Sequence, residues 1–152
     1  MNLVPLDPIG LTAYKSRFAK IAENSPRQFG KMTATEMLNH VRLLVEVSLE
    51  ERQLPDFSTW FTRTALFHWV LIEMLPWPKG KVKAPVDLLD PTLKSFDEER
   101  QLLVSTLERF AAAVGAQPSR ITRSPMVGNI TLQKWSRLHG RHLEHHLQQF
   151  GA

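Results

Sequence analysis

The C-terminal stretch KWSRLHGRHLEHHLQQFG holds most of the residues that could carry chemistry. Four of the six histidines lie in it: His139, His142, His145 and His146. Successive residues on a helix turn by about 100°, so His142 and His146 share one face with Trp135 and Gln149. We expect this face to point into the protein, with the other two histidines on its flanks. An i, i+4 pair of imidazoles suits one metal ion, although most such pairs are structural or lie on the surface.

His40 is the strongest candidate for a third ligand. It lies between Met37 and Leu44 on the apolar stripe of another predicted helix, where an unpaired polar group is costly. If the two helices are neighbours, His40, His142 and His146 converge as a three-histidine site. Three neutral protein ligands leave one position for water or substrate, as in catalytic sites. The absence of cysteine excludes thiolate ligands, and we expect Zn²⁺ or Ni²⁺.

These candidates must be positioned by helices, because hydrophobic residues recur at helical spacing along most of the chain. Five helices are predicted and no strand: residues 11–23, 33–54, 58–75, 95–115 and 131–149. The third is apolar on most sides, which predicts contacts with several neighbours. The proline-rich stretch 76–91 is read as a long crossover loop, and Gly115 as a helix C-cap. The pattern predicts an all-α fold, an antiparallel four-helix bundle with one accessory helix.

Capping sequences mark the starts of three of these helices. In TATE, the Thr33 side chain can accept from the backbone while Glu36 reaches back to the cap, which makes a capping box. SFDE repeats this arrangement with Ser95 and Glu98, and Thr131 can cap the last helix. The caps therefore predict where the two histidine-bearing helices begin.

Composition favours a single globular domain over residues 1–152. The chain is 43% hydrophobic and 22% charged, and its net charge of +4 is spread along the sequence, which does not favour a nucleic-acid partner. The N-terminus lacks the features of a signal peptide. The apolar segment TALFHWVLIEMLPWP is too short and too interrupted to span a bilayer. We therefore expect a cytoplasmic protein without a membrane partner.

Two motifs, SPRQFGKMTATEMLNH and KWSRLHGRHLEHHLQQFG, resemble the DinB-like superfamily. They are most similar to a branch catalogued as a domain of unknown function, and the spacing of LPWPKGK and DPT between them also fits that branch. The resemblance covers nearly the whole chain, with Phe29 where the branch often has Trp. It implies a bundle of DinB-like topology, with His40, His142 and His146 as metal ligands and Gln149 orienting the site.

The resemblance also implies a class of reaction. Characterised relatives are metal-dependent enzymes that use low-molecular-weight thiols, and this chain, which has no cysteine, would need an exogenous thiol. We therefore interpret the protein as a metal-dependent thiol S-transferase or hydrolase with an unknown small-molecule substrate. His139, His145 or Glu144 could relay protons, and the sequence does not single out a catalytic residue.

Two other interpretations stay open at this point. The protein could be a non-catalytic module that binds a metal or a small ligand, or the histidines could hydrogen-bond to one another inside the core. His68, within the apolar segment 58–75, is expected to be a core or pocket-lining histidine. The aromatic residues Trp60, Phe61 and Phe67 add surplus apolar surface, which favours a homodimer.

Overall fold

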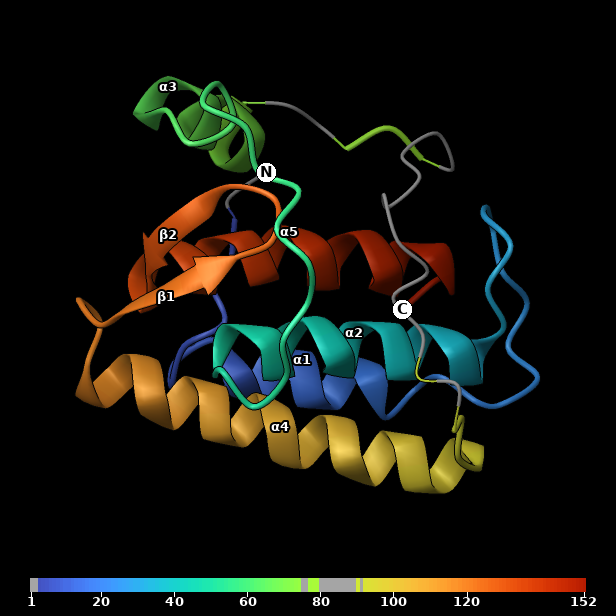
Figure 1. The fold of residues 1–152 in the computed structure, drawn as a ribbon. Coiled ribbons are helices and arrows are strands. Elements are labelled where there is room, and N and C mark those ends of the chain that lie inside the picture. The colour runs from blue at the N-terminus through green and yellow to red at the C-terminus, as the bar shows by residue number, and fades with distance from the viewer. Residues whose placement is uncertain (1–2, 75–76, 80–89, 91) are drawn as a thin grey trace.

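The computed structural model describes residues 3–74, 77–79, 90 and 92–152, and it is mostly helical (Figure 1). Its elements, in chain order, are α1 (Leu11–Phe18), α2 (Ala34–Ser48), α3 (Ala65–Trp69), the π-helix η1 (Val70–Met74), α4 (Phe96–Ala116), β1 (Ile121–Ser124), β2 (Gly128–Thr131) and α5 (Leu132–Gln149). None of the helices within these described ranges is long and apolar enough to cross a membrane.

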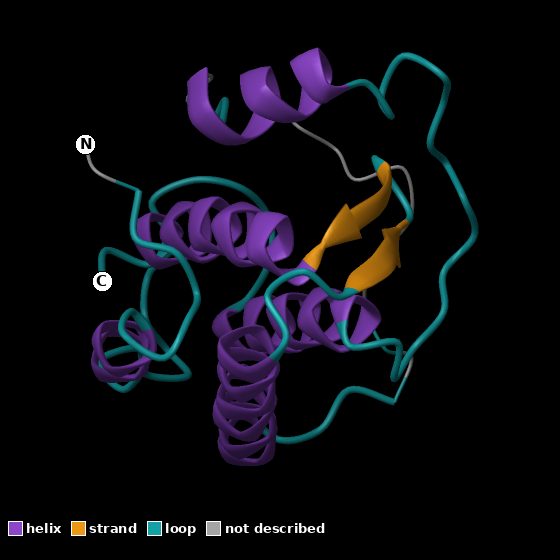
Figure 2. Cartoon of the chain, turned by 90° about the vertical axis from the view of Figure 1, so that its left-hand side faces the viewer, coloured by secondary structure: helices purple, strands orange, loops and turns teal. Residues whose placement is uncertain are grey.

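A shared apolar core lies between α1, α2, α4 and α5. α2 packs against α4 on one side and α5 on the other, while α1 contacts both α4 and α5 (Figures 1 and 2). The largest fully buried side chains of this core are Trp135, Phe18 and Phe110. Because α2 and α5 lie side by side, residues about a hundred positions apart in the sequence meet between them.

The three helix starts predicted from capping sequences are confirmed. The Thr33 hydroxyl accepts a hydrogen bond from the Glu36 backbone amide, and the Glu36 carboxylate accepts one from the Thr33 amide at 2.7 Å. Ser95 and Glu98 form the same reciprocal pair at the start of α4, and Thr131 caps α5. Each cap satisfies backbone donors that the first helical turn leaves free, so the first turns of α2 and α5 are fixed locally.

The prediction that the chain has no strand is wrong, and the all-α class must be corrected to a mostly helical fold with one small sheet. β1 and β2 pair antiparallel, with Ile121 opposite Thr131. The Thr122 hydroxyl accepts from the Trp135 indole at 2.9 Å and donates to the Ser48 carbonyl at 2.9 Å, so the hairpin is docked on α5 and α2. In strands of only four residues, the alternation of apolar and polar residues is too short to distinguish a strand from a loop.

The third predicted helix is also wrong in extent. Residues 58–64 form loops and turns, Thr64 caps α3, and the helix changes to a π-helix at Val70. Leu66 and Trp69 are 67% and 52% exposed, so apolar composition on all sides did not lead to burial on all sides. Most of the predicted crossover loop, 76–91, lies outside the described residues.

Three helix ends differ from the prediction. α2 stops at Ser48, with Leu49 as its C-cap, and not at residue 54. α1 stops at Phe18, and a turn in which the Ile21 amide donates to the Phe18 carbonyl brings Ile21 into the core. α4 continues through Gly115 to Ala116, with Gln117 as the C-cap. Gly115 is therefore a residue of the helix, where Pro8 packs against it too closely for a side chain.

Candidate metal centre

The structure brings His40, His142 and His146 together between α2 and α5. His142 and His146 project from the same face of α5, and the edge of the His40 ring meets both of them with ring centroids 5.0 Å away. The Nε2 atom of His142 lies 3.0 Å from that of His40 and 3.1 Å from that of His146. One nitrogen from each ring lies within 4.8 Å of the other two, which is the spacing of a candidate metal site.

The three rings are buried, and burial keeps the imidazoles of His142 and His146 neutral. His40, His142 and His146 are 5%, 4% and 6% exposed. Desolvation lowers the pKa of His146 to about 3, and the neighbouring His40 lowers it further while Gln149 opposes the shift. Desolvation, with His146 and His40 beside it, also holds the pKa of His142 well below its usual value. A neutral imidazole has the lone pair that metal coordination requires.

Gln149 fixes the tautomer of His146. The Gln149 amide nitrogen donates to the Phe29 carbonyl at 3.0 Å, so its oxygen is the atom that faces His146 Nδ1 at 2.9 Å. His146 Nδ1 must therefore carry the proton, which leaves the lone pair on Nε2, the nitrogen that faces the other two histidines. Metal-binding histidines are commonly oriented by such a second hydrogen bond.

Hydrogen bonds among neutral rings do not satisfy this arrangement. The His142 Nε2 atom has either one hydrogen or one lone pair, so at most one of its two contacts with His40 and His146 is a regular hydrogen bond. In a tetrahedral zinc site, bonds of about 2.0–2.1 Å place two ligand nitrogens about 3.3 Å apart. A small outward shift of the rings makes room for an ion, so the three residues fit a divalent metal.

The other predicted histidines of α5 occupy two different environments. His139 is fully buried, stacks on Trp135 with ring centroids 5.0 Å apart, and lies 2.8 Å from the Ser48 hydroxyl through Nε2. It therefore belongs to the core beneath the hairpin, and Trp135 contacts it there. His145 is half-buried, and its ring lies 5.2 Å from that of His146. Burial lowers the pKa of His145, and the nearby charge of Lys79 adds to this effect.

His68 lies where a core histidine was expected. It is 6% exposed, and its Nε2 atom lies 3.1 Å from the Val127 carbonyl in the turn of the hairpin. It thus joins α3 to the hairpin and does not belong to the three-histidine group.

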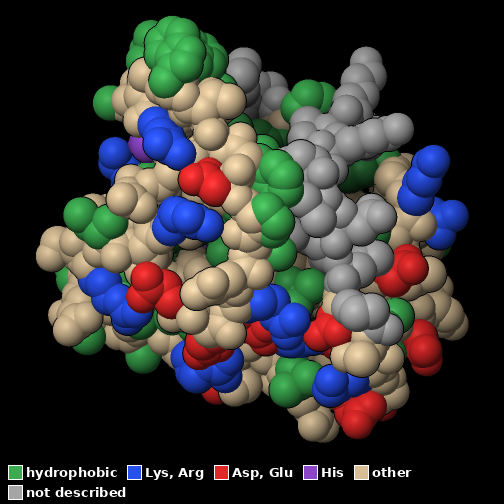
Figure 3. All heavy atoms as spheres, in the orientation of Figure 1, with side chains coloured by type: hydrophobic (Ala, Val, Ile, Leu, Met, Phe, Trp, Pro, Cys, Tyr) green, Lys and Arg blue, Asp and Glu red, His purple; other side chains and the backbone are tan. Residues whose placement is uncertain are grey.

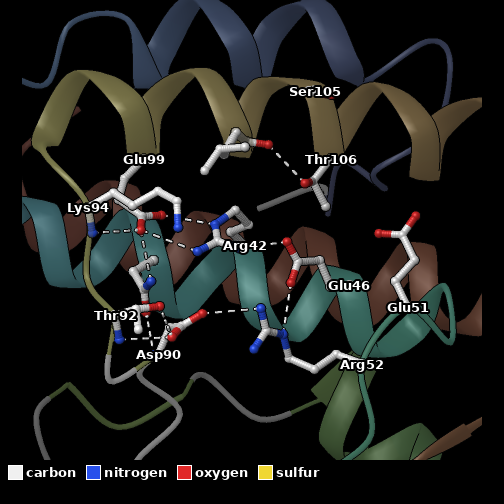
Figure 4. A network of polar contacts seen from close by, with 12 residues as sticks. Arg42, Glu46, Glu51, Arg52, Asp90, Thr92, Lys94, Glu99, Ser105 and Thr106 are labelled. Carbon is white, nitrogen blue, oxygen red and sulfur yellow. Dashed lines mark hydrogen bonds and ion pairs between the residues drawn. The ribbon is translucent and has the colours of Figure 1, made fainter.

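A second buried polar group occupies the opposite side of α2, and the sequence reasoning missed it. Glu99 of α4 is fully buried and accepts hydrogen bonds from Asn39 at 3.0 Å and from Arg42 at 2.9 Å (Figure 4). Arg42 also donates to Glu46 at 2.7 Å. Burial alone would raise the pKa of Glu99, but the hydrogen bonds from Arg42 and Asn39 outweigh it and the pKa is lowered. We call Asn39, Arg42, Glu46 and Glu99 the ionic network.

The ionic network also contacts Asp90, which lies before α4 in the sequence. The Asp90 amide donates to the Asn39 side chain at 2.9 Å, and Arg52 joins Glu46 to Asp90 (Figure 4). Asn39, Arg42 and Glu46 recur at a spacing of three and four residues, so their common face was detectable. Such a polar stripe is usually exposed, and nothing in its spacing indicates a buried partner.

One comparison with known proteins gives a match. Residues 7–152 match the model of a family described as Protein of unknown function (DUF1569). No curated protein and no solved structure matches the sequence. The match covers nearly the whole chain, including all three histidines of the cluster, and supports the expectation of a domain of unknown function. The chain therefore belongs to the DUF1569 family.

Proposed function

We propose that this protein binds one divalent metal ion, Zn²⁺ or Ni²⁺, through His40, His142 and His146 and uses it in thiol transfer or hydrolysis. The observation that supports this most strongly is the meeting of three buried imidazoles at Nε2, with contacts of 3.0 and 3.1 Å. The Gln149 side chain directs the lone pair of His146 toward the same point. Three protein ligands leave a position for a small molecule.

The chain's own residues would bind the ion and limit the access of water to it. His40 comes from α2 and the other two ligands from α5, so the packing of these helices sets the distance between them. When bound, a divalent ion supplies Lewis-acid chemistry, which lowers the pKa of a coordinated water or thiol toward neutrality. The burial of the three rings strengthens this electrostatic effect because little solvent screens it.

A non-catalytic binding module is the second candidate, and one observation favours it. Among the described residues, no carboxylate belongs to the three-histidine group. Glu144, the carboxylate considered as a proton relay, is held by Arg17 at 2.5 Å and by Gln148 at 2.8 Å. His139 is enclosed by Trp135 and Phe110. Turnover assays with thiols and electrophiles distinguish the candidates, since metal binding without turnover supports the module.

We also propose that the four longer helices follow the DinB-like topology. The support is the resemblance of the two sequence motifs and the pairing of α2 with α5, which places one histidine of the first motif against two of the second. An experimental structure with the ion bound would test the helix order and the ligands together.

Metal analysis of untagged protein tests the proposed site directly. We expect about one divalent ion per chain in the wild type and little in His142→Ala. His68→Ala is the matched control, because His68 is as buried as His142 and lies outside the cluster. Circular dichroism on all three proteins verifies folding. Equal metal content in wild type and His142→Ala would refute the assignment.

The homodimer stays a prediction. Trp60 and Phe61 are 83% and 52% exposed, their rings lie 5.9 Å apart, and hydrophobic side chains gather over the α3 region in Figure 3. Light scattering at several protein concentrations tests it, and a monomer throughout would contradict it.

A further inference from the structure

Beside the three histidines lies a group of side chains that we call the aromatic border: Phe29, Trp77, Lys79 and His145. The Phe29 ring lies 5.1 Å from that of His145, and the Trp77 ring lies 6.2 Å from His145 and 6.1 Å from His142. The Lys79 ammonium lies 5.6 Å from the centre of the Phe29 ring. The border therefore adjoins the cluster at two places, where Trp77 faces His142 and where His145 lies beside His146.

Hydrogen bonds hold the Trp77 ring and the backbone of Phe29. The Trp77 indole donates to the Leu71 carbonyl at 3.2 Å. The Phe29 carbonyl accepts from Gln149, the residue that also contacts His146. Gly30, at φ +78°, allows this approach, since a Cβ there would lie 2.5 Å from the Gln149 amide nitrogen. The rings are thus positioned before any ligand arrives, which reduces the entropy cost of binding.

The charge of the border is positive, and no carboxylate of the described residues forms an ion pair with it. Lys79 is exposed and makes no ion pair with any described residue. Neither ring nitrogen of the half-buried His145 is hydrogen-bonded within the described part of the chain. The adjacent carboxylate of α5, Glu144, is engaged by Arg17. Within the part of the chain that the structure describes, the border therefore offers a cation beside aromatic faces without a competing carboxylate.

We propose that the aromatic border binds an organic anion, with its flat apolar part against Phe29 and Trp77 and its carboxylate beside Lys79. This assignment rests on the proposed metal function, because it names the class of substrate that reaches the ion held by the histidines. A cationic ligand would be repelled by Lys79, and a small inorganic anion would gain nothing from the two rings.

The test uses full-length protein loaded with Co²⁺, whose visible spectrum reports thiol coordination. The probes are 4-mercaptobenzoate and 4-mercaptobenzamide, which share a thiol and a ring and differ by one charge. We expect the wild type to bind the carboxylate about fivefold more tightly, near the upper end for an exposed ion pair. Lys79→Met should reduce this ratio to about one, while Lys20→Met, an exposed lysine at the end of α1, should preserve it.

The outcomes separate this proposal from the proposed function. Trp77→Leu should weaken both probes to a similar degree, because the ring contact does not depend on charge. If cobalt is bound but neither probe changes its spectrum, or if Lys79→Met leaves the affinity ratio intact, the border does not bind an organic anion. If the protein holds no cobalt, the metal function itself fails.

Discussion

The two sides of helix α2 carry two kinds of buried polar group. On the side toward α4, Glu99 accepts hydrogen bonds from Arg42 and Asn39. Arg42 also donates to Glu46, and the Asn39 side chain also accepts from the Asp90 amide. On the side toward α5, His40 and His142 meet at 3.0 Å, and the Nδ1 atom of His142 has no hydrogen-bond partner among the described residues. Asn39 and His40 are sequence neighbours, yet they belong to these different groups.

This difference separates a structural role from a ligand-binding one. Charges that are fully hydrogen-bonded in the core mainly fix how helices pack, and removing one partner leaves the other uncompensated. In the histidine cluster, the His142 Nε2 atom cannot form regular hydrogen bonds to both His40 and His146, and its Nδ1 atom has no partner among the described residues. We therefore expect mutations in the ionic network to affect folding and mutations in the histidine cluster to affect metal binding.

The largest expected effect is on the ionic network. Glu99→Ala should lower the free energy of unfolding by about 3–5 kcal/mol, because it leaves the Arg42 guanidinium buried without its main partner. Glu108 lies on α4 like Glu99, but it is exposed and pairs with Lys15 of α1. Glu108→Ala should therefore lower the free energy of unfolding by at most about 1 kcal/mol. Urea unfolding of the metal-free proteins measures both, and equal losses would contradict the comparison.

The histidine cluster should behave in the opposite way. His142→Leu should leave the metal-free protein about as stable as wild type. It replaces a buried imidazole, whose Nδ1 atom has no hydrogen-bond partner among the described residues, by an apolar side chain. In wild type, free Zn²⁺ at about 1,000 times its dissociation constant should add about 4 kcal/mol, and this gain should vanish in the variant. Thermal unfolding with and without the ion measures it. If Zn²⁺ does not raise the melting temperature of the wild type, the cluster does not bind the ion and the contrast between the two sides of α2 is wrong.

A smaller effect is expected from Gln149, which contacts only one ligand. Gln149→Ala should weaken metal affinity about 10- to 100-fold, because His146 loses the hydrogen bond that fixes its tautomer. Gln148→Ala is the matched control, since its neighbouring amide donates to Glu144 and not to a ligand. Competition with a chelator measures the affinities. Similar losses in both variants would mean that Gln149 does not orient the site.

The smallest effect is a pH dependence at the edge of the ionic network. Hydrogen bonds from the Thr92 side chain and backbone lower the pKa of Asp90 to about 2, and Arg52 adds to the shift. Because the folded pKa is depressed, this carboxylate contributes stability above its unfolded pKa of 3.8 and loses it as pH falls toward 2. Asp90→Asn should therefore flatten the acid loss of stability of the metal-free protein, whereas the exposed control Asp97→Asn should not. Urea midpoints over that range measure it.

The candidate site was largely predictable from sequence, while its surroundings were not. His142 and His146 share a face because helical periodicity is local, and His40 was recognisable as a polar residue on an apolar stripe. The fully buried position of His139 was not predicted, because it depends on Ser48 and the hairpin. The hairpin itself was missed since each of its strands has only four residues.

The ionic network shows the same limit more sharply. The spacing of Asn39, Arg42 and Glu46 predicts a common face, and such a polar face is ordinarily exposed. It is buried here because Glu99, about sixty residues later, supplies the opposite charge from α4. The residue pattern of α2 alone cannot predict this partner on another helix.

The sequence by itself determined where the three capped helices begin and which side chains share a face. Both properties depend on hydrogen bonds and spacings within a few residues, so Thr33, Ser95 and Thr131 could be assigned as caps and the histidines as a set. Only the tertiary structure decided which polar faces are buried, and which rings and charges border the histidines. Those outcomes depend on contacts between segments far apart in the chain, such as Phe29 with Gln149 and Arg42 with Glu99.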